Sequence, residues 1–108
     1  MYQPITAQEL LGLFDEFIAT NRDILERKGN DYSGNVDRLR NFKASSIVKV
    51  APENGILVRI VDKITRISEL LEHDAAIRSE TIEDTISDLH NYVFLLYALV
   101  KSKEDLPF

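Results

Sequence analysis

Hydrophobic residues recur along most of the chain at steps of three and four positions, the spacing of an α-helix that buries one face. In the first such segment, Thr6 and Glu9 form a capping-box pattern that marks a helix start. Basic residues followed by Gly29 suit a helix end. We therefore expect a first helix over Thr6–Lys28, followed by a polar loop over Gly29–Asn35.

Three further helices follow from the same spacing. We expect the second over Val36–Val50, the third over Pro52–Leu71, and the fourth from Ser79 or Thr81 to Ser102. The residues expected to face inward are Leu39, Phe42 and Ile47; Leu57, Ile60, Val61, Ile64, Ile67 and Leu71; and Ile82, Ile86, Leu89, Val93, Leu96 and Val100. A β-hairpin over Ile47–Val50 and Ile56–Val61 is the alternative, because Asn54-Gly55 is a hairpin signal. The unbroken helical spacing as far as Leu71 favours the helix.

The segment Tyr92–Val100 is apolar almost all round. A helix that is apolar on every side is buried on every side, and four helices in 108 residues leave little to cover this one. The sequence therefore predicts an all-α, four-helix bundle-like single domain over residues 1–108. It also predicts a homo-oligomer with the fourth helix near the interface.

Composition narrows the classes of protein. The 44% of hydrophobic residues exclude a disordered chain, and the absence of cysteine excludes disulfides and thiol-based sites. No apolar run reaches the ~18 residues of a membrane helix, and the N-terminus lacks a signal-peptide pattern. We therefore expect a cytoplasmic protein with no membrane partner. The net charge of −5 argues against non-specific binding of duplex nucleic acid.

Acidic residues on the fourth helix suggest chemistry. Asp84 and Asp88 lie one turn apart on one face, where two carboxylates suit a divalent cation such as Mg²⁺. Asp62 of the third helix is a candidate third ligand. The alternative interpretation is a solvated acidic face near a helix N-terminus, which the helix dipole favours.

Basic and polar residues suggest a place for phosphate. Arg59, Lys63 and Arg66 line the third helix and suit phosphate oxygens, although an ion-pair ladder of Asp62, Arg66 and Glu69 within the helix also explains such charges. The histidines lack a partner at metal-ligand spacing, and no Walker loop is present. Further candidate ligand-binding residues lie in the polar loop, in the second helix and one turn beyond Asp88: Lys28, Asp31, Tyr32, Arg38, Asn41, Phe42, Asn91 and Tyr92.

Four motifs in order resemble a known family. They are Lys-Gly-x-Asp-Tyr-Ser-Gly from Lys28, Arg-x-x-Asn-Phe-Lys from Arg38, Asp-Lys-x-x-Arg from Asp62, and Glu-Asp-x-x-x-Asp-Leu-x-x-Tyr from Glu83. Together they resemble the phage-enriched nucleotide modification associated domain 1 family, which is similar to the MazG-like all-α nucleotide pyrophosphatases. The resemblance covers residues 25–100.

The resemblance implies an oligomeric helical bundle that binds nucleotides in the host cytoplasm. By analogy with the MazG-like enzymes, Asp62, Asp84 and Asp88 would hold Mg²⁺ and carry catalysis, while Lys63 and Arg66 would bind phosphate. The chain departs from that pattern, because cations replace acids of the usual Glu-Glu-x-x-Glu cluster on the third helix.

This departure leaves three hypotheses open. The first is a magnesium-dependent pyrophosphatase that acts on nucleoside triphosphates. The second is a non-catalytic protein that sequesters a nucleotide, such as a cyclic nucleotide signal of bacterial anti-phage defence. The third is a structural or protein-interaction bundle. Whether the chain is an enzyme stays open at this stage.

Overall fold

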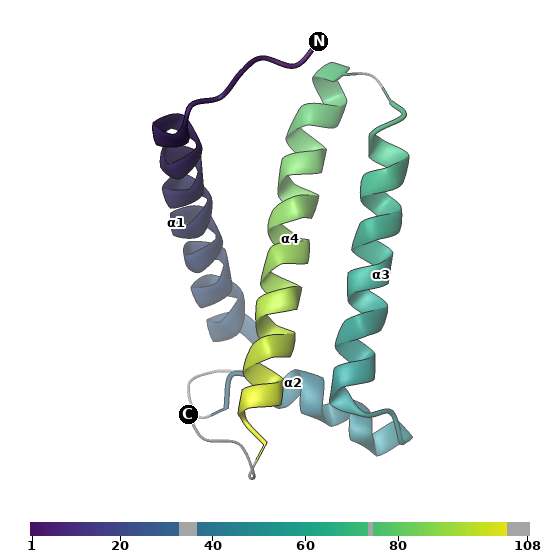
Figure 1. Cartoon of the computed structure of the whole chain (residues 1–108). Helices are drawn as coiled ribbons and strands as arrows, with labels where there is room; N and C mark the ends of the chain where they lie inside the picture. Colours follow the sequence, from purple (N-terminus) through teal and green to yellow (C-terminus); the bar gives the residue numbers. More distant parts are fainter. Residues whose placement is uncertain (33–36, 74, 104–108) are drawn as a thin grey trace.

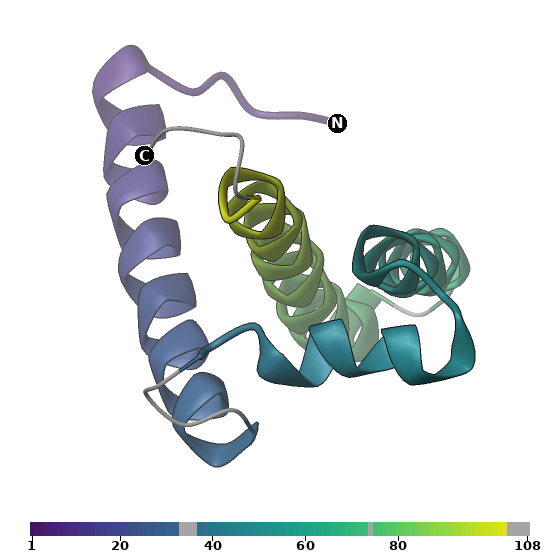
Figure 2. The same cartoon turned by 90° about the horizontal axis from the view of Figure 1, so that it is seen from below.

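Helices form every regular element that the structure describes. The computed structural model describes the backbone of residues 1–32, 37–73 and 75–103. These residues contain α1 (Ala7–Tyr32), α2 (Arg40–Lys43), the 3-10 helix η1 (Ala44–Val48), α3 (Pro52–Leu70) and α4 (Ala75–Lys101). The all-α, bundle-like fold class is therefore confirmed. In Figures 1 and 2, α4 lies between α1 and α3.

The start of α1 follows the capping-box prediction. The backbone N–H of Glu9 donates to Thr6 Oγ1 at 3.1 Å, and the Thr6 hydroxyl donates to the Glu9 carboxylate at 3.1 Å. The predicted end is wrong, because α1 continues through Gly29 to Tyr32. An interior glycine costs a helix only about 1 kcal/mol relative to alanine, so Gly29 alone does not end it.

The second helix is shorter and more broken than the sequence predicts. Between Arg40 and Val48 the chain forms α2 and then η1. Lys49, which follows η1, has a left-handed φ of 62°. Figure 2 shows this segment passing from the end of α1 to the start of α3. Ile47 is exposed, which contradicts its expected burial.

The core lies where α2 meets the paired helices α3 and α4. Leu39, Ile56 and Leu99 are buried together, and Phe42 is among the half-buried residues packed on them. Pro52 is at the start of α3. A backbone N–H in the first turn of a helix has no acceptor within the helix, so proline, which has no N–H, is tolerated there. Because residues 44–48 and 56–61 are helical, the hairpin alternative is excluded.

The expected burial of α3 and α4 is partly wrong. Seven of the residues expected to face inward are exposed in the single chain: Leu57, Val61, Ile64, Leu71, Ile86, Val93 and Val100. Helical spacing shows which residues share a face, but it does not show what covers that face. Despite this apolar content, none of the described helices is long and apolar enough to cross a membrane.

Candidate functional site

Three helices bring charged side chains together at Asp88. Lys28 Nζ of α1 lies 3.2 Å from Asp88 Oδ1, and Lys63 Nζ of α3 lies 3.2 Å from Asp88 Oδ2. Each carboxylate oxygen therefore has its own ammonium partner, and the Asp88 side chain is 27% exposed. We name this group the Asp88 junction. Its two cations and one anion leave a net charge of +1 at a surface-accessible point.

An aromatic cluster lies one helical turn along the same two helices. The Arg59 guanidinium lies 5.3 Å from the ring centroid of Phe42 and 5.8 Å from that of Tyr92. The two rings meet edge to face, with centroids 6.5 Å apart. Arg59 precedes Lys63 by one turn of α3, as Tyr92 follows Asp88 by one turn of α4. The aromatic cluster and the Asp88 junction are thus neighbours on the α3–α4 pair.

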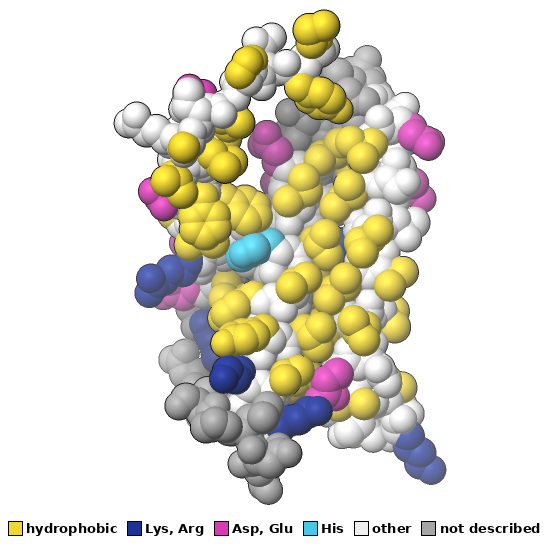
Figure 3. All heavy atoms as spheres, in the orientation of Figure 1, with side chains coloured by type: hydrophobic (Ala, Val, Ile, Leu, Met, Phe, Trp, Pro, Cys, Tyr) yellow, Lys and Arg dark blue, Asp and Glu magenta, His cyan; other side chains and the backbone are white. Residues whose placement is uncertain are grey.

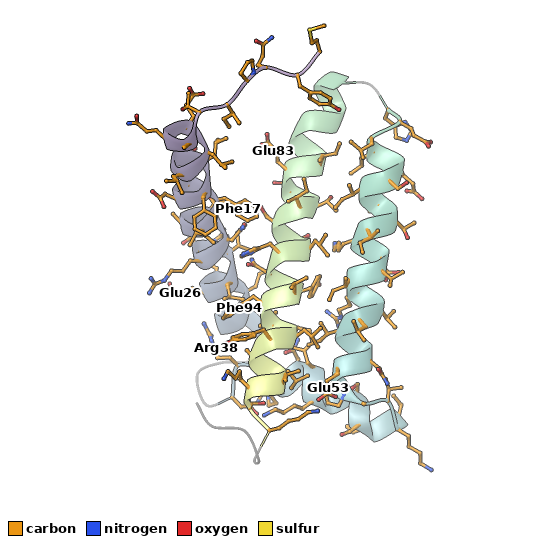
Figure 4. All side chains as sticks on the ribbon, viewed as in Figure 1. Phe17, Glu26, Arg38, Glu53, Glu83 and Phe94 are labelled. Carbon is orange, nitrogen blue, oxygen red and sulfur yellow. The ribbon has the colours of Figure 1, made fainter. Side chains whose placement is uncertain are left out.

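Local contacts hold the segment that carries Phe42. The Asp37 carboxylate accepts hydrogen bonds from Lys43 Nζ at 2.9 Å and from the Leu39 N–H at 3.0 Å. These two bonds, the lysine bond foremost, hold the pKa of Asp37 below its ordinary range. Arg38 Nη2 donates to the Glu26 carbonyl of α1 at 3.0 Å, and Figure 4 shows Arg38 beside the end of that helix. Arg38 thus ties this segment to α1.

The three aspartates proposed as metal ligands are not grouped. Asp62 and Asp84 are exposed, whereas Asp88 is held between its two lysines. Among the side chains that the structure describes, no three acidic or histidine residues are close enough to hold a metal ion. Magnesium binding therefore stays a prediction. Arg66 Nη1 lies 3.9 Å from Glu69 Oε2, the contact that the ion-pair ladder predicts.

The remaining predicted ligand residues lie on α1, α2 and α4. Asn41 is exposed on α2. The side chains of Asp31 and Tyr32 lie outside the described part of the structure. Asn91 is buried, and its Nδ2 donates to the backbone carbonyl of Asn21 at 3.1 Å, so it joins α4 to α1.

A polar contact between α1 and α4 was missed from the sequence. Asn21 is 1% exposed, and its Nδ2 lies 3.3 Å from Nδ1 of His90, which also contacts Asn91 Oδ1 at 3.1 Å. The Phe17 ring packs edge to face on the His90 ring at 4.8 Å, and Figure 4 shows Phe17 between the two helices. One signal was available, because Asn21 interrupts the apolar spacing between Phe17 and Ile24.

Comparison with protein-family models, curated proteins and solved structures finds no significant match for this chain. The resemblance to the nucleotide modification associated domain 1 family therefore rests on the four motifs alone and stays a prediction.

Proposed function

We propose that the chain binds a nucleotide and holds it without cleavage. In this proposal Lys28, Lys63 and Arg59 receive the phosphate oxygens, and the rings of Phe42 and Tyr92 offer a surface for the base. The convergence of Lys28 and Lys63 on one carboxylate supports the proposal most directly. It places an excess of positive charge at one point of a chain whose net charge is −5.

Lys28 and Lys63 can bind phosphate oxygens either together with the Asp88 carboxylate or in its place. An ammonium group has three N–H donors, so each lysine can bind a phosphate oxygen while it keeps or releases Asp88. Arg59 is exposed beside the two rings, and the planar N–H groups of a guanidinium can make bidentate bonds to phosphate. In the free protein the Asp88 carboxylate occupies the two lysines, so an incoming phosphate competes with it for them.

Hydrolysis is the second candidate function. Asp84 and Asp88 stand one turn apart on α4, as a pair of magnesium ligands would. The donor set fits a resident Mg²⁺ poorly, because both oxygens of Asp88 already face ammonium groups and the other aspartates are exposed. For this reason we favour capture over the pyrophosphatase.

Titration of nucleoside triphosphates and cyclic dinucleotides by calorimetry, with Mg²⁺ or with chelator, tests the proposal. We expect Lys63→Gln to weaken binding about tenfold, the effect of losing one charge-assisted contact of about 1.4 kcal/mol. Arg27→Gln is the matched control: it also removes one positive charge, but Arg27 is exposed on α1 and pairs with Asp23 within the same helix.

Three results separate the hypotheses. Binding in chelator that Lys63→Gln weakens and Arg27→Gln preserves supports capture. Release of pyrophosphate only with Mg²⁺ supports the hydrolase. Absence of binding at micromolar concentration for every nucleotide contradicts both and leaves the structural bundle.

A further inference from the structure

The Asp88 junction and the aromatic cluster lie at neighbouring levels of the α3–α4 pair. Lys63 contacts Asp88 at one level, and Arg59 contacts the Tyr92 ring at the next. These levels are one helical turn apart, a rise of about 6 Å over four residues. In a nucleotide the sugar alone separates the base from the first phosphate, a path of a few bonds of about 1.5 Å each. A base at the aromatic cluster therefore places its first phosphate at the lysines of the junction.

The charge becomes negative one turn beyond the junction. Asp84 precedes Asp88 by one turn of α4 and is exposed. On the neighbouring turn of α3, Arg66 Nη1 lies 3.9 Å from Glu69 Oε2, so this pair adds no net positive charge. Asp62, at the same end of the junction, is also exposed. A second or third phosphate that extends in this direction meets an excess of negative charge.

The surfaces on either side of this path are apolar. Figure 3 shows hydrophobic side chains over much of the front of α3 and α4. Asp84 and Asp88 each lie two positions from the exposed Ile86, roughly 200° around the axis of α4, so both carboxylates lie on the side away from Ile86. On α1, the turn before the junction lysine presents the half-buried Ile24 and Leu25. An elongated phosphate chain therefore passes Asp84.

We infer, on the basis of the proposed function, that the ligand carries a single phosphate on its sugar. A nucleoside monophosphate and a phosphodiester-linked nucleotide share this chemistry. The Asp88 junction has a net charge of +1, and Arg59 raises the local charge to +2. A phosphate monoester, which carries about −1.5 to −2 at pH 7, balances that charge. A triphosphate exceeds it, and Asp84 repels the outer phosphates. Asp84 is thus a specificity-determining residue that disfavours polyphosphates.

Calorimetric titration in chelator tests the order of affinities. The ligands are the mono-, di- and triphosphates of the common ribonucleosides, cyclic dinucleotides and ribose phosphate. We expect the monophosphate of the preferred base to bind at least about threefold more tightly than its triphosphate, because two unit charges about 6 Å apart repel by this factor in water. A site that responded to charge alone would show the reverse order. Ribose phosphate should bind about tenfold more weakly than the monophosphate, because it lacks the stacked base.

Asp84→Asn tests the role of the carboxylate. It should raise the affinity for the triphosphate about threefold and change the affinity for the monophosphate less than about 1.5-fold. Glu83→Gln is the matched control, because it removes the same charge from an exposed residue that lies about 100° away around α4. Glu83→Gln should leave the order of affinities unchanged. Circular dichroism of both variants confirms that the helices are intact.

The outcomes separate the ligand class from capture itself. The expected order, narrowed by Asp84→Asn and not by Glu83→Gln, supports the single-phosphate ligand. Tighter binding of a cyclic dinucleotide than of the monophosphate identifies the phosphodiester form. A triphosphate that binds most tightly in chelator overturns the single-phosphate ligand while capture stands, as do equal effects of Asp84→Asn and Glu83→Gln. If no nucleotide binds at micromolar concentration, capture fails and the single-phosphate ligand fails with it.

Discussion

Asp88→Asn separates capture from metal-dependent hydrolysis, because the two functions predict effects of opposite sign. In a metal site Asp88 is a ligand, so the substitution should abolish turnover. At an anion site the Asp88 carboxylate competes with phosphate for Lys28 and Lys63, which lie 3.2 Å from its two oxygens. Removal of its charge should then tighten nucleotide binding.

The size of the gain follows from Coulomb's law. A phosphate oxygen bound to either lysine would lie roughly 5 Å from Asp88, where two unit charges repel by about 0.8 kcal/mol in water and about 3 kcal/mol at an effective dielectric of 20. The Asp88 side chain is 27% exposed, so the effective dielectric around it lies between these two values. We therefore expect at least about fivefold tighter binding, a gain of about 1 kcal/mol.

Calorimetric titration in chelator at constant ionic strength measures the effect. Glu83→Gln is the control, because it removes the same charge from an exposed position of α4, labelled in Figure 4, and should change affinity less than about twofold. In the free protein Asp88→Asn should lower the free energy of unfolding by about 1 kcal/mol, the value of two partly exposed ion pairs. Loss of binding by a folded Asp88→Asn variant would refute the reasoning.

Three further substitutions test the fold. Ile56→Ala should lower the free energy of unfolding by about 2–5 kcal/mol, since Ile56 is fully buried; urea denaturation at fixed protein concentration measures this. Asn91→Ala should cost about 0.5–1.5 kcal/mol in the same assay, because it removes the hydrogen bond from Asn91 Nδ2 to the Asn21 carbonyl that joins α4 to α1. Asp37 has a lowered pKa, so its contribution to stability is present above its unfolded pKa of about 4 and is lost as the pH falls through the folded value. Asp37→Asn should thus destabilise at neutral pH, and thermal melts should show the difference from the unaltered chain vanishing in acid.

The helices could be predicted from the sequence, but their ends and buried faces could not. Apolar spacing located α3 almost to the residue, because Pro52 marks its start. The predicted end of α1 depended on Gly29, whose cost in a helix is small enough for the chain to continue to Tyr32. The stripe that includes Ile64 was predicted to be buried because spacing alone does not identify the covering element.

The candidate site depended on tertiary contacts that the sequence does not encode locally. Lys28 and Asp88 are 60 positions apart, and only the packing of α1 on α4 joins them. Lys28, Lys63 and Asp88 were each singled out from motifs, but their mutual pairing was not predicted. Within α3, by contrast, the Arg66–Glu69 pair followed directly from helical spacing.

Recovery of bound ligand tests the central claim most directly. The purified chain would be incubated with nucleoside triphosphates and cyclic oligonucleotides, with Mg²⁺ or with chelator, then heat-denatured, and the released molecules would be identified by mass-resolved chromatography. We predict that one nucleotide is depleted from solution in chelator and returned intact after heating, and that Lys63→Gln reduces the amount recovered. Monophosphate and pyrophosphate formed only with Mg²⁺, or recovery of no nucleotide at all, would contradict capture.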